Sequence, residues 1–74
     1  MNAGLVKKSL TLAGHRTSVS LESEFWAALN RFAETDGCSL AKLLTRIDAE
    51  RGDAHLASAL RVYALKRTAE RAER

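Results

Sequence analysis

Polar and apolar side chains alternate along residues 16–21, and this is the clearest pattern near the start of the chain. Successive side chains of an extended strand point to opposite faces, so the alternation predicts a half-buried strand over residues 16–21. Val19 and Leu21 form its apolar face. Its polar face consists of Arg16, Ser18 and Ser20.

A second alternating segment, Lys8–Leu12, precedes this strand. Residues 13–15 separate the two segments, and they include a glycine that is compatible with a turn. Residues 1–15 are therefore expected to form either a basic N-terminal arm or an additional strand. The pattern leaves open whether Lys8–Leu12 stays open or closes a hairpin within the chain.

Three segments with helical periodicity follow the strand, because apolar residues recur along them at spacings of three and four. The expected helices cover residues 22–36, 39–51 and 53–70. Gly37 and Gly52 separate them, and Ser39 and Asp53 are suited to cap helix N-termini. The apolar face of the strand and the stripes of the first two helices form the predicted core: Val19, Leu21, Phe25, Leu29, Phe32, Leu43, Leu44 and Ile47.

Two features lie outside these stripes. Trp26 is displaced by about 100° from the stripe of its helix, so we expect it at the edge of the core or against a neighbour. Residues 66–74 contain few apolar side chains, which is typical of a solvated helix end.

The length of 74 residues predicts a single domain, mainly α with a short β-ribbon. A core of this size is marginal, and the single cysteine excludes an intrachain disulfide, so oligomerisation is the expected source of further burial. A lone strand also leaves backbone groups unpaired. Two chains that pair residues 16–21 antiparallel about a two-fold axis would meet both needs. We therefore expect a homodimer that shares its core.

The positive charge is concentrated at one end of the chain. Lysine and arginine total 12 and aspartate and glutamate total 9, which gives a net charge of +3. The first acidic residue is Glu22, so Lys7, Lys8 and Arg16 carry the whole excess. A basic arm on a neutral body is a plausible contact surface for a polyanion, and ordinary solvated lysines are the alternative.

The strand, the helix that follows it and the glycine-separated second helix together resemble the ribbon-helix-helix family of Arc/MetJ-type repressors. The segment Gly14–Glu22, followed by Phe25-Trp26 and later by Ile47–Gly52, is similar to a largely uncharacterised bacterial subfamily of these domains. The resemblance covers about residues 7–66. It implies an intertwined homodimer with an extra C-terminal helix, and a transcriptional repressor or antitoxin-type autoregulator.

The resemblance also implies roles for individual residues. The strand positions that read bases in the family fall on Arg16, Ser18 and Ser20 in this sequence. An arginine can bind guanine O6 and N7 together, and a serine hydroxyl can donate or accept. The residues expected at DNA phosphates are Lys7, Lys8 and the start of the second helix, namely Ser39, Leu40, Ala41 and Lys42.

Serine is short for reaching base edges, and an extra Lys8–Leu12 strand within the chain would narrow or block the approach of the ribbon to DNA. The third helix also exceeds the one-strand, two-helix core of the family. An alternative is therefore kept, in which the dimer is a protein-interaction or assembly module without DNA readout. Its partner, a toxin or another protein, would bind through the C-terminal helix.

No catalytic constellation, glycine-rich phosphate loop or metal-ligand spacing occurs in the sequence. We therefore expect no enzyme activity, no cofactor and no metal. The sequence has no apolar run of membrane-spanning length and no visible signal peptide, so a cytoplasmic protein without membrane contact is expected.

Overall fold

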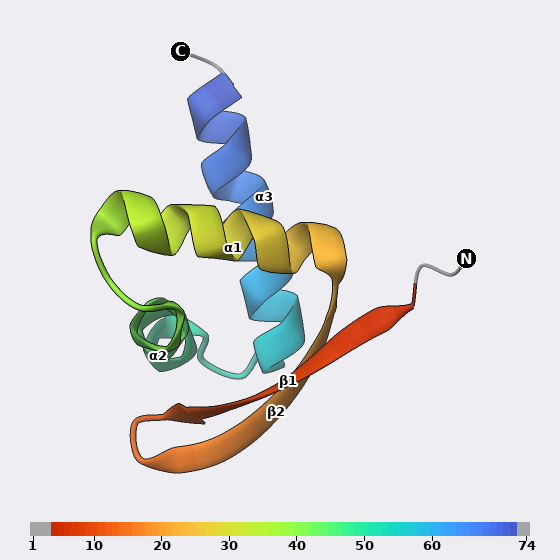
Figure 1. Ribbon diagram of the computed structural model, residues 1–74, viewed down its shortest axis with the longest axis vertical. Helices are drawn as coiled ribbons and strands as arrows, with labels where there is room; N and C mark the ends of the chain where they lie inside the picture. The colour runs from red at the N-terminus through yellow and green to blue at the C-terminus, as the bar shows by residue number, and fades with distance from the viewer. Residues whose placement is uncertain (1–3, 73–74) are drawn as a thin grey trace.

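The computed structural model describes residues 4–72, which form a β-hairpin followed by three helices (Figure 1). The hairpin lies along one side of the helices, and α3 runs away from it toward its C-terminal end (Figure 1). The elements are β1 (Leu5–Leu12), β2 (His15–Glu22), α1 (Ser23–Asp36), α2 (Leu40–Glu50) and α3 (Leu56–Ala72).

The segment before the predicted strand is itself a strand, so the open alternative resolves to a hairpin within one chain. β1 and β2 pair antiparallel over their whole length, from Leu5 opposite Glu22 to Leu12 opposite His15. The turn has only two residues, Ala13 with φ 51° and Gly14 with φ 83°. Two positive φ values are characteristic of the type I′ turn, whose twist matches that of the strands it joins.

The helix ends follow the sequence signals closely at the α1–α2 junction. Gly37 adopts a left-handed conformation after α1, and its amide donates to Glu34. Ser39 caps α2, because its side chain accepts from the amide of Lys42 at 3.1 Å. The C-cap and N-cap thus lie two residues apart, which fixes a tight connection between the two helices.

The third helix begins later than the expected residue 53. Ala54 donates its amide to the carbonyl of Arg51, and the Arg51 guanidinium donates in turn to the Ala54 carbonyl. These bonds close a turn around Gly52, whose φ of 61° is left-handed. The helix therefore begins at Leu56 and extends to Ala72.

One core joins the hairpin to all three helices. Seven of the eight predicted core residues are buried in this single chain, whereas Phe25 is only partly buried and packs at the core margin. Trp26 takes the central position instead, with 3% of its surface exposed, because it lies against the inner face of β1. The third helix adds Leu60 and Ala64, both almost fully buried.

Charged side chains fasten α3 to the rest of the fold. Arg67 donates to both carboxylate oxygens of Asp36, at 2.9 and 2.6 Å, and its guanidinium lies 4.6 Å from the ring centroid of Phe32. Near the other end of the helix, Arg61 pairs with Glu22 at 2.9 Å. Arg67 is thus docked against α1, whereas Lys66 and residues 68–72 are exposed, as expected for a solvated helix end.

Within the single chain, β1 pairs with β2, and α3 adds buried residues to the core. The two needs that led us to expect an intertwined dimer are therefore met by β1 and α3 within one chain. The structure contains one copy, so it shows no intertwining of two chains. None of the helices described between residues 4 and 72 is long and apolar enough to cross a membrane.

Candidate nucleic-acid interface

The hairpin has an inner face that packs on the helices and an outer face directed to solvent. Leu12, Val19 and Leu21 are buried on the inner face. Since side chains alternate along a strand, the outer face carries the odd-numbered residues of β1 and the even-numbered residues of β2. Its polar members are Lys7, Ser9, Thr11, Arg16, Ser18, Ser20 and Glu22, of which Ser20 and Glu22 are half-buried and the others exposed.

The structure brings the three predicted base-contact residues together on one face. Beside them lie Lys7, which was predicted at a phosphate, and Ser9 and Thr11, which the prediction missed. Cross-strand pairing places Lys7 opposite Ser20, Ser9 opposite Ser18, and Thr11 opposite Arg16. The hydroxyls of Ser9 and Ser18 lie 3.0 Å apart and share a hydrogen bond. The alternation of polar and apolar residues in β1 could have identified these residues, because it assigns each one to a face once the hairpin register is known.

The two neighbouring lysines, both predicted at phosphates, lie on opposite faces. Lys7 is exposed on the outer face beside Ser20. Lys8 lies on the inner face, where its ammonium is 5.5 Å from the ring centroid of Trp26. The same indole donates to the Val6 carbonyl at 2.8 Å. Lys8 and Trp26 thus belong to the attachment of the hairpin to α1.

The predicted phosphate anchor at the start of α2 is a capped helix N-terminus. The Ser39 hydroxyl is occupied by the Lys42 amide. Leu40 and Ala41 are half-buried, and the side chain of Lys42 is exposed. Amides in a first helical turn have no intrahelical acceptor, which leaves them available to an anion. Among residues 4–72, no recorded hydrogen bond or ion pair connects this segment to the outer face of the hairpin.

The outer face is electrostatically positive. Its acidic member is Glu22 at the end of β2, and the hydrogen bond from Arg61 holds the pKa of this carboxyl below its ordinary value. The carboxylate is therefore paired with α3. Within the part of the chain that the structure describes, the four ion pairs involve Glu22, Asp36 and Asp48, and none involves Lys7 or Arg16. Both cationic side chains project without an acidic partner.

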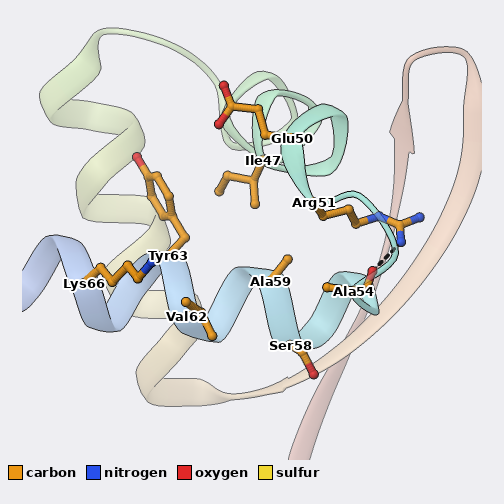
Figure 2. Close-up of a pocket in the computed structure, with 9 residues that line it drawn as sticks. All are labelled: Ile47, Glu50, Arg51, Ala54, Ser58, Ala59, Val62, Tyr63 and Lys66. Atoms are coloured by element: carbon orange, nitrogen blue, oxygen red, sulfur yellow. Dashed lines mark hydrogen bonds between the residues drawn. The ribbon is translucent and has the colours of Figure 1, made fainter.

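A second surface feature is a groove of about 430 Å³ between α2 and α3 (Figure 2). Ile47 projects from α2 and Tyr63 from α3 into the space between the helices, while Glu50 and Lys66 lie at its margin (Figure 2). Val62 lines the groove with 48% of its surface exposed, and Leu65 is 67% exposed. These two residues share a face of α3 because they are three positions apart.

Neither surface carries an evident catalytic or metal-binding group. Among residues 4–72, no cluster of three or more His, Cys, Asp or Glu residues could hold a metal ion. The hairpin face offers hydroxyls, an ammonium and a guanidinium, and these groups can donate hydrogen bonds and neutralise anions. Recognition of a polyanion is the chemistry that this arrangement supports.

Comparison with known proteins places these features in context. A family model described as a ribbon-helix-helix domain matches residues 5–68, a range that includes β1 and most of α3. Among solved structures, the chain is similar to an uncharacterized protein from Bordetella pertussis Tohama I, with 37% sequence identity and a TM-score of 0.84. The similarity covers 96% of this chain and 61% of that chain, so this chain spans less than two thirds of its length. The search among curated proteins found no match.

Proposed function

Because the chain belongs to the ribbon-helix-helix domain family, we propose that it is a dimeric, sequence-specific DNA-binding protein. It acts as a transcriptional repressor or an antitoxin-type autoregulator and places an antiparallel β-ribbon in the major groove. The family typically contains DNA-binding regulators and is usually non-enzymatic.

The outer face of the hairpin is the observation that carries this proposal. Arg16 and Ser18 are exposed on it, Ser20 lies beside them, and the helices cover only the opposite face. The major groove admits a two-stranded ribbon, and an arginine that projects from such a ribbon can bind guanine O6 and N7 together. Lys7 and the N-terminus of α2 supply the phosphate contacts, which orient the protein without reading sequence.

The dimer in this proposal rests on the family, whose fold usually dimerises. The outer edge of β2 has no strand neighbour among residues 4–72, so its backbone groups can pair with another strand. Light scattering at micromolar concentration, with and without DNA, measures the assembly. A mass near twice 8.1 kDa for the free protein supports a preformed dimer, and a mass that doubles only with DNA indicates assembly on the site.

The decisive test is DNA binding by the wild type and by Arg16→Ala. The wild type is expected to select a defined sequence from random duplexes and to lose affinity steeply as salt rises, because each neutralised phosphate releases counterions. Loss of an arginine–guanine contact should cost about 1–3 kcal/mol on the selected site and relax the preference at one base pair.

Lys7→Ala is the matched comparison, because it lies on the same face but is assigned to a phosphate. It should weaken binding to all duplexes to a similar extent and reduce the salt slope by about one unit. If the wild type binds every duplex with the same weak affinity, and Arg16→Ala behaves identically, sequence-specific regulation is excluded.

A second candidate function is a protein-interaction module, and the groove between α2 and α3 favours it. Its apolar floor and charged margin fit an amphipathic helix of a protein partner. Deletion of α3 would remove Leu60 and Ala64 from the core, so point substitutions are the proper test. Val62→Glu and Leu65→Glu should abolish recovery of a stoichiometric partner while DNA binding persists. Recovery that is unchanged by both substitutions would place the partner elsewhere.

A further inference from the structure

We propose that α3 is a self-association surface, on which the α3 helix of a second copy of this chain lies antiparallel. The contact uses the exposed side of α3 and the groove between α2 and α3, and it leaves the hairpin free. The inference therefore goes beyond the proposed function. It also differs from the second candidate function, because the helix that occupies the groove belongs to a copy of this chain.

The two sides of α3 have different surroundings. One side carries Leu60 and Ala64, which are almost fully buried in the core. On the other side, Val62 is 48% and Leu65 67% exposed, and these are the large apolar side chains that the described helices leave in solvent. They belong to a series of exposed, uncharged residues at alternating spacings of four and three, the spacing along which two helices pack. The series consists of Ser58, Val62, Leu65, Ala69 and Ala72.

A projecting side chain and a recess lie next to each other on this surface. Leu65 projects into solvent and takes no part in the core. Val62, one turn earlier, lines the groove of about 430 Å³ together with Ile47 and Tyr63 (Figure 2). A contact between two identical surfaces about a two-fold axis requires both features on each surface. With the axis between Val62 and Leu65, Leu65 of each copy lies opposite Val62 of the other, at the edge of its groove.

The charges beside the groove favour the antiparallel direction. Glu50 and Lys66 lie at the groove margin, and neither takes part in the ion pairs recorded among residues 4–72. In the antiparallel contact, Lys66 of the second copy lies over Ala59, on the side of α3 that faces Glu50. The two-fold axis therefore creates two Lys66–Glu50 pairs. A parallel contact would place Arg61 beside Lys66 of the second copy, where the like charges repel.

The size of the surface predicts a weak contact. Stable protein interfaces bury about 1,200–2,000 Å² in total, and a helix pair that meets over about 21 Å buries less. We therefore expect the isolated protein to associate through α3 at micromolar or higher concentration. Where a shared duplex or another contact already holds two copies together, the effective concentration of the second α3 is higher and the same contact fills.

The first test compares the masses of the wild type and Leu65→Glu by light scattering from micromolar to millimolar concentration. The wild-type mass should double over this range. Leu65→Glu should keep the lower mass, because each contact loses two buried leucines and its dissociation constant rises at least about 30-fold. Leu5→Glu is the matched control, since it replaces a leucine that is 55% exposed on β1 and should associate like the wild type. Thermal unfolding followed by circular dichroism checks that each variant folds.

Charge reversal tests which side chains meet. Lys66→Glu and Glu50→Lys should each raise the dissociation constant about three- to tenfold at low salt, because each replaces attraction by repulsion in two exposed pairs. The double variant exchanges the two charges and should recover the wild-type dissociation constant.

Disulfide formation tests the direction of the two helices, in a Cys38→Ser background that removes the native thiol. Chains with Val62→Cys and chains with Leu65→Cys are mixed and oxidised at a concentration where the wild type associates. The mixed disulfide should predominate, because these two positions lie opposite each other in the antiparallel contact. Mass spectrometry identifies it, since the two chains differ by one methylene group. Predominance of the two symmetric disulfides would indicate a parallel contact and overturn the proposed arrangement.

The remaining outcomes are equally decisive. A wild-type mass that stays constant up to millimolar concentration, equal masses of the wild type and Leu65→Glu, or a double charge variant without recovery overturns the inference. Capture of a different protein that Leu65→Glu abolishes, without self-association, assigns the surface to that partner and also overturns it. The proposed function is tested separately, because Leu65→Glu should select the same DNA sequence as the wild type whether or not α3 self-associates.

Discussion

The two faces of the β1–β2 hairpin arise from the same alternation of side chains but lie in opposite surroundings, one against the helices and one in solvent. On the inner face, Leu12, Val19 and Leu21 are buried against the helices. On the outer face, Arg16 and Ser18 project into solvent and have no contact with the core. A shift of one residue in the strand register would exchange the two sets completely. The register that buries the apolar residues of the inner face therefore also exposes the polar residues of the outer face.

Stability and the proposed recognition therefore depend on different faces of the hairpin. A change on the inner face acts on the free energy of unfolding, because it removes packed apolar surface. A change on the outer face leaves the fold nearly unaffected, since exposed side chains contribute little to stability. The following substitutions test that separation, beginning with the largest expected effect.

Leu21→Ala should lower the free energy of unfolding by about 2–5 kcal/mol, because this fully buried side chain leaves a cavity between the hairpin and the helices. Urea denaturation measures the loss. Arg16→Ala, on the opposite face, should change the same quantity by no more than about 0.5 kcal/mol. Comparable losses for the two variants would show that the outer face is not free of the fold.

Trp26→Phe removes the hydrogen bond to the Val6 carbonyl and part of a buried ring, so it should cost about 1–3 kcal/mol. Since Trp26 is the single tryptophan, unfolding must be followed by circular dichroism. Amide exchange in β1 should accelerate more than exchange in α2, because the bond ties α1 to β1. Uniform acceleration across all elements would contradict this attachment.

The turn offers a pair of opposite substitutions. Gly14→Ala should destabilise the domain by about 1–2 kcal/mol, because a Cβ atom is strained at φ 83° although no atom crowds it. Ala13→Gly should relieve the corresponding strain at φ 51° and stabilise by at most about 1 kcal/mol. Melting temperatures of the two variants should therefore move in opposite directions, and a shift in the same direction would argue against the two-residue turn.

The smallest effect concerns acid stability through Asp36. The hydrogen bond from Arg67, with its charge and the weaker contribution of Arg46, holds the pKa of Asp36 below its ordinary value of 3.8. Its contribution is therefore complete above about pH 4 and is lost as pH falls through the lower pKa of the folded state. Asp36→Asn should flatten the acid limb of stability against pH at low salt. An unchanged limb would assign acid sensitivity to other carboxyls, with Glu22 the first to examine.

The sequence determined the polar face of β2 and most of the core, because alternation and helical periodicity depend only on local spacing. It could not decide the pairing partner of residues 16–21. The turn that decides it places Ala13 at a positive φ, and alanine carries no signal for that conformation. The place of Ser9 and Thr11 on the candidate interface was missed for the same reason.

The burial of Trp26 in place of the predicted Phe25 has a different cause. The periodicity of α1 fixes the spacing of its apolar residues, whereas the orientation of the helix depends on the hairpin that packs beside it. The ion pair of Arg67 with Asp36 could not be predicted either, because Arg67 lies in a charged segment 31 residues after its partner and no local pattern connects the two. Long-range contacts of this kind follow from the tertiary fold alone.

The short connection between β1 and β2 has a kinetic consequence. Strands joined by two residues meet by a local search that takes microseconds, and such a search needs no encounter with another chain. An interlaced pair of chains would instead reach its native state at a rate that depends on protein concentration. A newly synthesised copy can therefore complete its hairpin without waiting for a second copy.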